Sequence, residues 1–266
     1  MTLPAPGPDR TAVVTGASSG IGAEIARDLS RRGHHVTLVA RSVEPLEALA
    51  AELGEATVLP CDLGDRDARA GLVERVAGTG RVVDVLVNNA GFSTLGPVHD
   101  ADPDAEAGMV EVDVLAVVDL CTRWLPGMVE RGRGGVLNVA STAAFQPLPG
   151  QAGYGAGKAF VLSYSQSLAG ELRGTGVTAT CLCPGPVDTG FGERAGFSKA
   201  DAEEALPPVM WVEAAEVARQ GVAGLDRGRM VVVPGLANRV AASVASRLPV
   251  RLLMPVLTRS HPALRD

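Results

Sequence analysis

Short apolar runs alternate with longer amphipathic stretches along almost the whole chain, and no other feature of the sequence restricts the fold as much. Each run is apolar over nearly its full length, as is typical of strands that are buried on both faces of a sheet. The runs are TAVVTG (11–16), HVTLVA (35–40), ATVLPCD (56–62), VDVLVNNAG (83–91), GVLNVAS (135–141), VTATCLCPG (177–185) and MVVVPG (230–235). The pattern predicts a parallel sheet of about seven strands.

The stretches between these runs have the composition and the periodicity of helices. The expected helices span residues 21–32, 43–53, 66–77, 104–131, 152–173 and 213–224. Strands and helices in steady alternation, joined by right-handed crossovers, build a doubly wound α/β sheet with helices on both faces. We therefore expect one Rossmann-type domain over residues 11–235, with its ligand site at the carboxyl ends of the strands.

Three segments fall outside this alternation. Residues 1–10 are Pro-rich and lack the pattern of a signal peptide, so we expect a flexible tail. Residues 186–212 are rich in Gly and Pro with a charged middle, which favours a lid over the substrate. Residues 236–266 have roughly helical spacing, and we expect a helical tail that packs on its own domain or on a partner subunit. A membrane surface is the alternative, but Pro249 and Pro255 would interrupt a continuous membrane-lying helix.

Composition argues against several kinds of partner. The net charge of −6 disfavours a broad surface for nucleic acid or anionic membranes, because such surfaces need clustered Lys and Arg. No apolar run reaches the roughly 20 residues that a membrane-spanning helix needs. We expect a cytoplasmic protein with no nucleic-acid partner and no stable membrane insertion.

The four cysteines are few and scattered, so a disulfide framework is not expected and a reducing compartment fits. The pair most suggestive of a metal site is Cys181 and Cys183, which share one face of an expected strand. No His and no second Cys pair lies near them in the sequence. We interpret them as buried thiols and expect no metal.

The stretch VVTGASSGIG, after the first expected strand, is compatible with two kinds of site. Gly16, Ser18 and Gly20 match the G-x-S-x-G elbow that presents the nucleophile of serine hydrolases. That chemistry needs a histidine base. No histidine has a sequence setting that suggests this role; the four are His34, His35, His99 and His261.

The second interpretation is a turn that holds the phosphates of a dinucleotide. Gly16 would let the chain turn off the strand, Gly20 would let the backbone approach a pyrophosphate, and Gly22 would let the following helix pack closely on the sheet. The spacing is G-x-x-x-G-x-G, which differs from the more usual G-x-G-x-x-G. The cofactor contacts expected here are Gly16, Ser18, Ser19, Gly20, Ile21 and Gly22.

Five motifs follow one another in order, and together they are far more specific than the glycine turn alone. They are TGASSGIG (15–22), NNAG (88–91), Ser141, the pair Tyr154 and Lys158, and PGPVDTG (184–190). In this order and at these separations the chain resembles the short-chain dehydrogenase/reductases from about Thr11 to Val233. The resemblance implies a Rossmann-type oxidoreductase that uses a nicotinamide cofactor and no metal.

The residues that end the second expected strand favour NADP(H) over NAD(H). An acidic residue about 20 positions after the glycine turn would hold the ribose 2′-hydroxyl of NAD, whereas an arginine accommodates the 2′-phosphate of NADP. This chain has Ala40 and Arg41 there. Asp62 and Leu63 match the adenine-contacting position of the resembled family, although Asp62 could instead cap a turn. The resemblance adds cofactor contacts at Asn88, Asn89, Ala90, Gly91, Pro184, Gly185, Val187 and Thr189.

Tyr154 and Lys158 are four residues apart, so a helix places the phenol and the ammonium on one face. A nearby positive charge stabilises phenolate and lowers the pKa of the phenol. In the resembled family the Lys also binds the nicotinamide ribose, the Tyr donates the proton to the carbonyl oxygen, and the Ser hydrogen-bonds that oxygen. These roles fall to Lys158, Tyr154 and Ser141. A chance pairing is the alternative, but each is one of only two residues of its type.

Two positions depart from the resembled family. Asp113 stands where the resembled family usually has an Asn, which organises a water-linked proton path to the Lys partly through its backbone carbonyl. Asp could preserve that function, although its carboxylate adds charge close to Lys158. Gly157 stands where Ser or Thr is usual, and with Gly153 and Gly155 it makes the start of the helix flexible. The departures bear on the proton relay and on the geometry of the Tyr–Lys pair.

The expected reaction is hydride transfer between NADP(H) and a ketone or secondary alcohol, with Tyr154 as general acid or base. The expected substrate side is apolar; its residues are Phe92, Ala143, Phe145, Leu148, Phe191, Met210 and Trp211. We expect a homodimer or homotetramer. One alternative is a catalytically weak or inactive regulator that binds the cofactor, and another is isomerase or dehydratase chemistry, because a fold does not fix the reaction.

Overall fold

The protein is described from a computed structural model that covers residues 3–196, 206–260 and 264. The middle of the expected lid and the end of the expected helical tail lie outside the described residues. Of the first ten residues, 3–10 are described.

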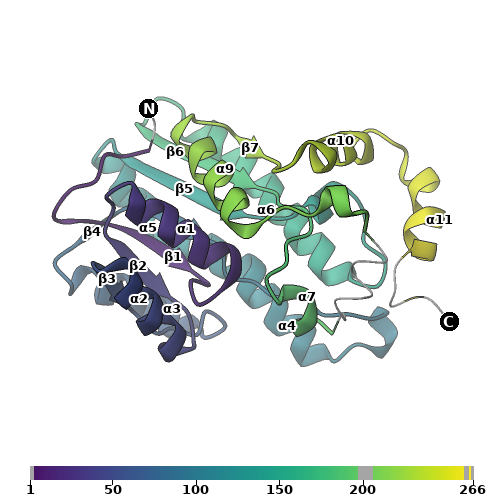
Figure 1. Ribbon diagram of the computed structural model, residues 1–266, viewed down its shortest axis with the longest axis horizontal. Coiled ribbons are helices and arrows are strands. Elements are labelled where there is room, and N and C mark those ends of the chain that lie inside the picture. Colours follow the sequence, from purple (N-terminus) through teal and green to yellow (C-terminus); the bar gives the residue numbers. More distant parts are fainter. Residues whose placement is uncertain (1–2, 197–205, 261–263, 265–266) are drawn as a thin grey trace.

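The strands of the described chain form one parallel sheet (Figure 1). Their order is β3-β2-β1-β4-β5-β6-β7. The first three strands extend the sheet to one side of β1 and the last four extend it to the other side, so the strand order reverses between β1 and β4. The strands are β1 Arg10–Thr15, β2 Val36–Val39, β3 Ala56–Val58, β4 Val82–Asn88, β5 Gly134–Val139, β6 Val177–Leu182 and β7 Val231–Val232. The predicted seven-stranded, doubly wound parallel sheet is confirmed.

Helices cover both faces of this sheet (Figure 1). One face carries α1 Gly20–Arg31, α2 Val43–Leu53 and α9 Ala214–Asp226. The other carries α3 Arg66–Ala77, α5 Ala116–Glu130 and α6 Ala152–Glu171. Successive residues of a strand enter different cores: Val13 packs with the α3, α5 and α6 side, and Val14 packs with the α1, α2 and α9 side. This is why the strands read as continuous apolar runs.

The apolar runs of the sequence are longer than several strands. The run predicted over 56–62 is a strand only to Val58, and the run predicted over 83–91 is a strand only to Asn88. Their last residues leave the sheet at its carboxyl edge and form loops there. The site described below is built from these loops.

The prediction of one continuous helix over 104–131 is wrong at one turn, Glu111–Leu115. The chain forms α4 Pro103–Val110, then a π-helical turn Glu111–Leu115, and then α5. A π-helical turn holds one more residue than an α-helical turn, and such turns are frequent at functional sites. Asp113, in the middle of this turn, is 2% exposed. Its buried carboxylate contacts the N–H of Phe92 and the ammonium of Lys158, which belong to other elements.

Further short elements surround the carboxyl edge. They are the 3₁₀ turns Val98–Asp100, Thr142–Phe145 and Pro208–Met210, and the helices α7 Phe191–Arg194, α10 Leu236–Ala245 and α11 Val250–Ser260. The last two lie in the segment that was expected to be a helical tail. None of the described helices is long and apolar enough to cross a membrane.

Truncation of Leu137 tests the packing of the sheet. This side chain of β5 is fully buried in the core beneath α9, so Leu137→Ala should lower the free energy of unfolding by about 2–5 kcal/mol. Val98→Ala is the matched control, because Val98 is 65% exposed and its truncation should change stability by less than about 0.5 kcal/mol. Chemical denaturation of both variants measures the difference, and equal stabilities would contradict the described core.

Candidate active site

The glycine turn between β1 and α1 leaves no room for side chains at its key positions. Gly16 and Gly20 have φ values of 64° and 57°, a backbone conformation that favours glycine. A Cβ on Gly16 would lie 2.8 Å from the Cα of Ala90, and a Cβ on Gly20 would lie 2.9 Å from the Cβ of Thr189. A Cβ on Gly22 would collide with the carbonyl of Gly16. The turn is thus held close to two other loops of the same edge.

The N-terminus of α1 has the properties of an anion site. Ser19 is the N-cap residue, yet its side chain makes no capping hydrogen bond, and the first turn holds no acidic residue. In α2 and α3, by contrast, the first turn includes an acidic residue. The free N–H groups and the helix dipole favour a negatively charged ligand. The cradle and the helix end therefore fit the pyrophosphate of a dinucleotide.

The NNAG segment that follows β4 braces the glycine turn. The Asn89 amide donates to the carbonyls of Thr15 and Gly16 at 3.0 and 3.3 Å. The hydroxyl of Thr15 accepts from the N–H groups of Asn89 and Ala90 at 3.0 and 3.1 Å. A Cβ on Gly91 would lie 2.9 Å from both carboxylate oxygens of Asp113. The absence of a side chain at Gly91 therefore allows the π-helical turn to pack against the loop after β4.

Asn88, predicted as a cofactor contact, points its side chain into the protein. The side chain is part of a buried chain of hydrogen bonds: Asn88 donates to Asn138 at 2.8 Å, and Asn138 donates to Ser165 at 3.0 Å. Ser165 in turn donates to the carbonyl of Val161 in α6. The Asn88 side chain therefore links the ends of β4 and β5 to the helix that carries Tyr154.

The residues expected on the adenosine side lie on loops of the same edge. Thr15 pairs with Val39 in the sheet, so Arg41, two residues further along, follows β2 beside the glycine turn, and it is exposed. The Asp62 carboxylate accepts from the N–H of Gly64 at 2.9 Å, so it caps its turn while remaining exposed. Leu63 is 5% exposed.

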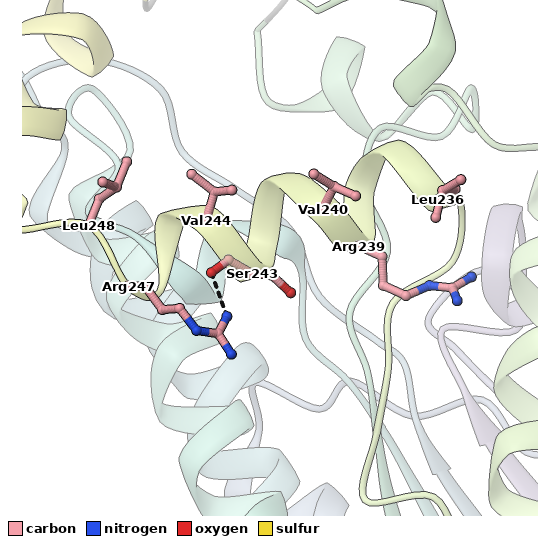
Figure 2. Close-up of a pocket in the computed structure, with 7 residues that line it drawn as sticks. All are labelled: Leu236, Arg239, Val240, Ser243, Val244, Arg247 and Leu248. Atoms are coloured by element: carbon pink, nitrogen blue, oxygen red, sulfur yellow. Dashed lines mark hydrogen bonds between the residues drawn. The ribbon is translucent and has the colours of Figure 1, made fainter.

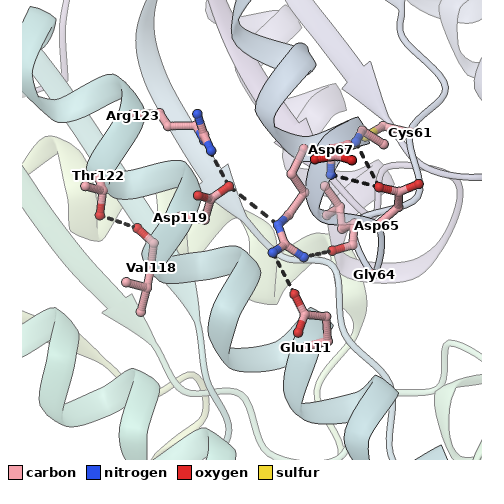
Figure 3. Close-up of polar contacts among 12 residues, drawn as sticks. Cys61, Gly64, Asp65, Asp67, Glu111, Val118, Asp119, Thr122 and Arg123 are labelled. Atoms are coloured by element: carbon pink, nitrogen blue, oxygen red, sulfur yellow. Dashed lines mark hydrogen bonds and ion pairs between the residues drawn. The ribbon is translucent and has the colours of Figure 1, made fainter. Parts of the chain in front are cut away.

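A buried arginine that the sequence analysis missed ties this adenosine-side loop to the π-helical turn. Arg69 of α3 is 3% exposed and donates to the carbonyl of Leu63. Its guanidinium also lies 2.6 Å from Glu111 and 3.5 Å from Asp119. Figure 3 labels these two acidic residues and marks their contacts with dashed lines. A charge so deeply buried needs such partners. Nothing in the local sequence separates Arg69 from the exposed arginines around it.

Ser141, Tyr154 and Lys158 come together at the carboxyl edge, as their positions in the sequence predict. Ser141 follows β5 and caps the 3₁₀ turn that begins at Thr142, accepting from the N–H of Ala143 at 3.1 Å. Tyr154 and Lys158 lie one turn apart on α6, and the Lys158 Nζ is 5.5 Å from the centre of the Tyr154 ring.

Asp113 pairs directly with Lys158. The Lys158 Nζ lies 2.9 Å from the Asp113 Oδ2 and donates to the carbonyl of Val139 at 3.3 Å. The other carboxylate oxygen accepts from the N–H of Phe92 at 2.9 Å. Both charged side chains are buried, so the pair is shielded from water. Asp113, which stands where an Asn was expected, therefore contacts Lys158 directly through its carboxylate.

This pairing affects the pKa values of Lys158 and Tyr154. Burial is the largest single influence and lowers the pKa of Lys158, but Asp113, Tyr154 and Cys181 together raise it by more, so the pKa of the ammonium is held above its ordinary value. Burial raises the pKa of Tyr154; Lys158 lowers that pKa, Asp113 raises it again, and a hydrogen bond from Ser141 lowers it. The balance leaves the pKa of Tyr154 above its ordinary value. The lysine alone would have had the opposite effect.

The loop after β6 runs from the Ser141 turn to the glycine turn. The Pro184 carbonyl accepts from the N–H of Thr142 at 2.8 Å, which joins this loop to the Ser141 turn. At its far end Thr189 lies over Gly20. Gly185 packs against Asn238 of α10, and Val187 packs on the core beneath α9. The loop therefore spans the space between Ser141 and the glycine turn, where a nicotinamide would lie.

Apolar and uncharged groups lie beside Tyr154. Its ring meets that of Phe191 with the centroids 5.8 Å apart and the planes tilted by 50°. The Gln151 amide donates to Ser93 at 2.6 Å and joins the loop after β4 to the start of α6. A Cβ on Gly155 would lie 2.9 Å from the Leu148 side chain, so the loop before α6 packs tightly on its first turn.

The surroundings of the histidines favour the dinucleotide interpretation of the glycine turn over the hydrolase interpretation. His34 and His35 precede β2 at the amino edge of the sheet, opposite Ser18, and His35 bonds there to Thr11 at 2.9 Å. His99 is 80% exposed and pairs with Asp100. His261 lies outside the described residues.

The cysteine pair lies within the protein, as expected for structural thiols. Cys181 and Cys183 are fully buried with their sulfur atoms 3.7 Å apart. Among the described residues, no group of three or more His, Cys, Asp or Glu side chains is arranged to hold a metal ion.

Comparisons with known proteins agree with this geometry. The short chain dehydrogenase family profile matches residues 10–198. The NADP-dependent 3-hydroxy acid dehydrogenase YdfG of Salmonella typhi is 42% identical over 179 residues, which are 66% of this chain and 71% of that protein.

Two solved structures extend the similarity to nearly the whole chain. A short-chain dehydrogenase from Sphingobium yanoikuyae in complex with NADPH is 34% identical, with a TM-score of 0.79, and the match covers 92% of this chain and 95% of that one. Actinorhodin polyketide ketoreductase with NADPH is 32% identical, with a TM-score of 0.76, and the match covers 85% and 96%. The chain belongs to the short-chain dehydrogenase/reductase family.

Proposed function

We propose that this protein is an NADP(H)-dependent oxidoreductase that transfers a hydride between the nicotinamide and a ketone or secondary alcohol. One observation carries the proposal: Ser141, Tyr154 and Lys158 lie together at the carboxyl edge, next to a glycine cradle and a helix end that fit a dinucleotide. The cofactor supplies or accepts the hydride. The protein binds both reactants and handles the proton.

The choice of NADP(H) rests on Arg41. It follows β2 beside the glycine turn, where an acidic residue would repel a 2′-phosphate, and its guanidinium can bind that phosphate through forked N–H donors. The similarity to two NADPH complexes and to an NADP-dependent dehydrogenase supports this assignment. The remaining contacts would come from the glycine turn, from Asn89 to Gly91, and from the loop that ends at Thr189.

In the direction of reduction, Tyr154 donates its phenolic proton to the carbonyl oxygen as negative charge develops there. Ser141 hydrogen-bonds the same oxygen and the phenol, which keeps the donor and the acceptor aligned. Lys158, held by Val139 and Asp113, binds the ribose on the nicotinamide side and supplies the positive charge next to the phenol. In the direction of oxidation the phenolate takes the proton from the alcohol.

Asp113 is one of the groups that influence this proton transfer, together with burial and Lys158. Its carboxylate offsets the positive charge of Lys158, so the phenol keeps its proton to higher pH than Lys158 alone would allow. A protonated Tyr154 is the form that reduction needs, and phenolate is the form that oxidation needs. Burial and Asp113 together thus keep Tyr154 in the protonated form that carbonyl reduction uses, in agreement with the reduced state of the NADPH pool in cells.

An apolar substrate suits the groups around Tyr154. The Phe191 ring lies beside the phenol, and among the described residues the charged side chains that affect the pKa of the phenol are Lys158 and Asp113. Burial of an apolar substrate against such groups excludes water and strengthens the hydrogen bonds to the reacting oxygen.

The alternative is a cofactor-binding regulator with weak or no catalysis. The neutralisation of Lys158 by Asp113 is the observation that favours it, because a less acidic Tyr154 is a slower proton donor. Both candidates predict NADPH binding, and turnover on a panel of ketones distinguishes them.

Tyr154→Phe should abolish most of the activity. Loss of the general acid should lower kcat by roughly 10²–10⁴, while NADPH binding, measured by nicotinamide fluorescence, should change little. Tyr164→Phe is the matched control, because the ring of Tyr164 stacks on Phe160, away from the reacting groups. Turnover that is the same in both variants would contradict the proposed acid.

Arg41→Ala should weaken binding of NADPH by roughly 10–100-fold, as expected when charged hydrogen bonds to a phosphate are lost. Binding of NADH should change much less, because NADH has no 2′-phosphate. Arg173→Ala, at another exposed arginine, is the control. Titrations followed by nicotinamide fluorescence give both dissociation constants, and equal losses for the two cofactors would refute the assignment.

Asp113→Asn should move the pH dependence of alcohol oxidation to lower pH. The amide keeps an oxygen for the N–H of Phe92 but removes the negative charge that raises the pKa of Tyr154, so phenolate forms earlier as the pH rises. The measurement is kcat/KM for oxidation against pH, with thermal unfolding to verify the fold. A profile that stays in place or moves to higher pH would contradict the role given to Asp113.

A further inference from the structure

Helix α10 has one face fixed to the protein and one face left open. On the inner face, Asn238 and Ala242 are buried. The Asn238 amide donates to the carbonyls of Met210 and Pro234 at 2.8 and 3.1 Å, and Gly185 packs against the same side chain. The helix is therefore anchored beside the loop that spans the nicotinamide position, and its opposite side faces outward.

The outward side of α10 is a stripe of exposed aliphatic side chains (Figure 2). Leu236, Val240 and Val244 are 72%, 56% and 50% exposed, and Leu248, just beyond the helix end, is 41% exposed. They are spaced four residues apart, so they lie in one row along the helix. The row continues toward α11, where Leu252 is 65% exposed.

Arginines flank this stripe, and no acidic residue accompanies them. Arg239 and Arg247 line the same shallow hollow as the aliphatic row, on one side of it (Figure 2). Arg251 and Arg259 follow on α11. Residues 236–260 thus carry four positive charges and no negative one, whereas the net charge of the whole chain is −6, which leaves −10 on the rest of it.

The charge pattern tells against a second copy of the chain as the occupant. In a symmetric dimer the same patch meets itself, so arginine would face arginine with no carboxylate between them. An aliphatic row with arginines beside it is instead the pattern of helices that lie in the interface of a bilayer. The aliphatic groups enter the acyl boundary, and the arginines reach the lipid headgroups.

We propose that the outer face of α10, with the start of α11, binds the surface of membranes rich in anionic lipids. The charge of the chain as a whole argued against such a surface, but the positive charge is concentrated on one segment. Neither proline interrupts the proposed surface, because Pro249 lies between the two helices and Pro255 lies in the middle of α11, beyond its start. The nicotinamide loop lies on the inner side of the same helix, so docking would bring the active site close to the lipid and to lipid-soluble ketones.

Vesicle cosedimentation of the full chain tests the proposal. The protein should bind vesicles that contain phosphatidylglycerol and should bind much less to vesicles of phosphatidylcholine alone, and added salt should weaken the binding. Arg239→Glu with Arg247→Glu should weaken binding by at least roughly 25-fold, since each arginine contributes roughly fivefold near an anionic surface. Val240→Ser with Val244→Ser should also weaken it, because the aliphatic row is lost.

Arg173→Glu with Arg227→Glu is the matched control, since it makes the same change of charge at exposed arginines elsewhere and should bind like the wild type. Thermal unfolding and ketone reduction in the absence of vesicles should be unchanged in all variants. Failure of the wild type to bind the anionic vesicles would overturn the proposal. So would equal losses in the α10 and control variants, or an effect of the α10 variants on oligomer mass, measured by light scattering, without an effect on vesicle binding.

Discussion

The buried ion pair between Lys158 and Asp113 is the interaction on which the arrangement of the site depends. Two charged side chains withdrawn from water are stable only when they are paired and hydrogen-bonded. Their partners come from separate parts of the chain: Asp113 from the π-helical turn, Lys158 from α6, Val139 from β5 and Phe92 from the loop after β4. These elements must therefore adopt one mutual position. That position also places Tyr154 next to the ammonium and Ser141 next to the phenol.

The same pair links the position of these groups to their chemistry. In a site with lysine alone, the positive charge would lower the pKa of the neighbouring phenol. Here the carboxylate offsets that charge, and burial makes phenolate still less favourable. The contact that fixes the position of Lys158 therefore also contributes, after burial, to the raised pKa of Tyr154.

The sheet and most of the site were predictable from the sequence, because both leave local signals. Strands buried on both faces appear as apolar runs, and the glycine turn and the Tyr–Lys pair depend on residues close together in the chain. The orientation of the Asn88 side chain could also have been inferred, because neighbouring residues of a strand point to opposite faces. The Asn89 side chain bonds to the glycine turn, so the Asn88 side chain points the other way, into the core. The π-helical turn and the buried Arg69 could not have been inferred, since they depend on partners such as Leu63 and Glu111 that only the fold brings together.

The central claim is that Asp113 and burial outweigh Lys158 in setting the acidity of Tyr154. Phenolate absorbance in the ultraviolet, followed as the pH of the cofactor-free protein is raised, measures this directly. The chain has two tyrosines, and Tyr154→Phe supplies the blank, so the difference between the two titrations isolates the ionisation of Tyr154. The account predicts ionisation above the ordinary value of about 10. Ionisation below that value would show that Lys158 dominates and would contradict the account.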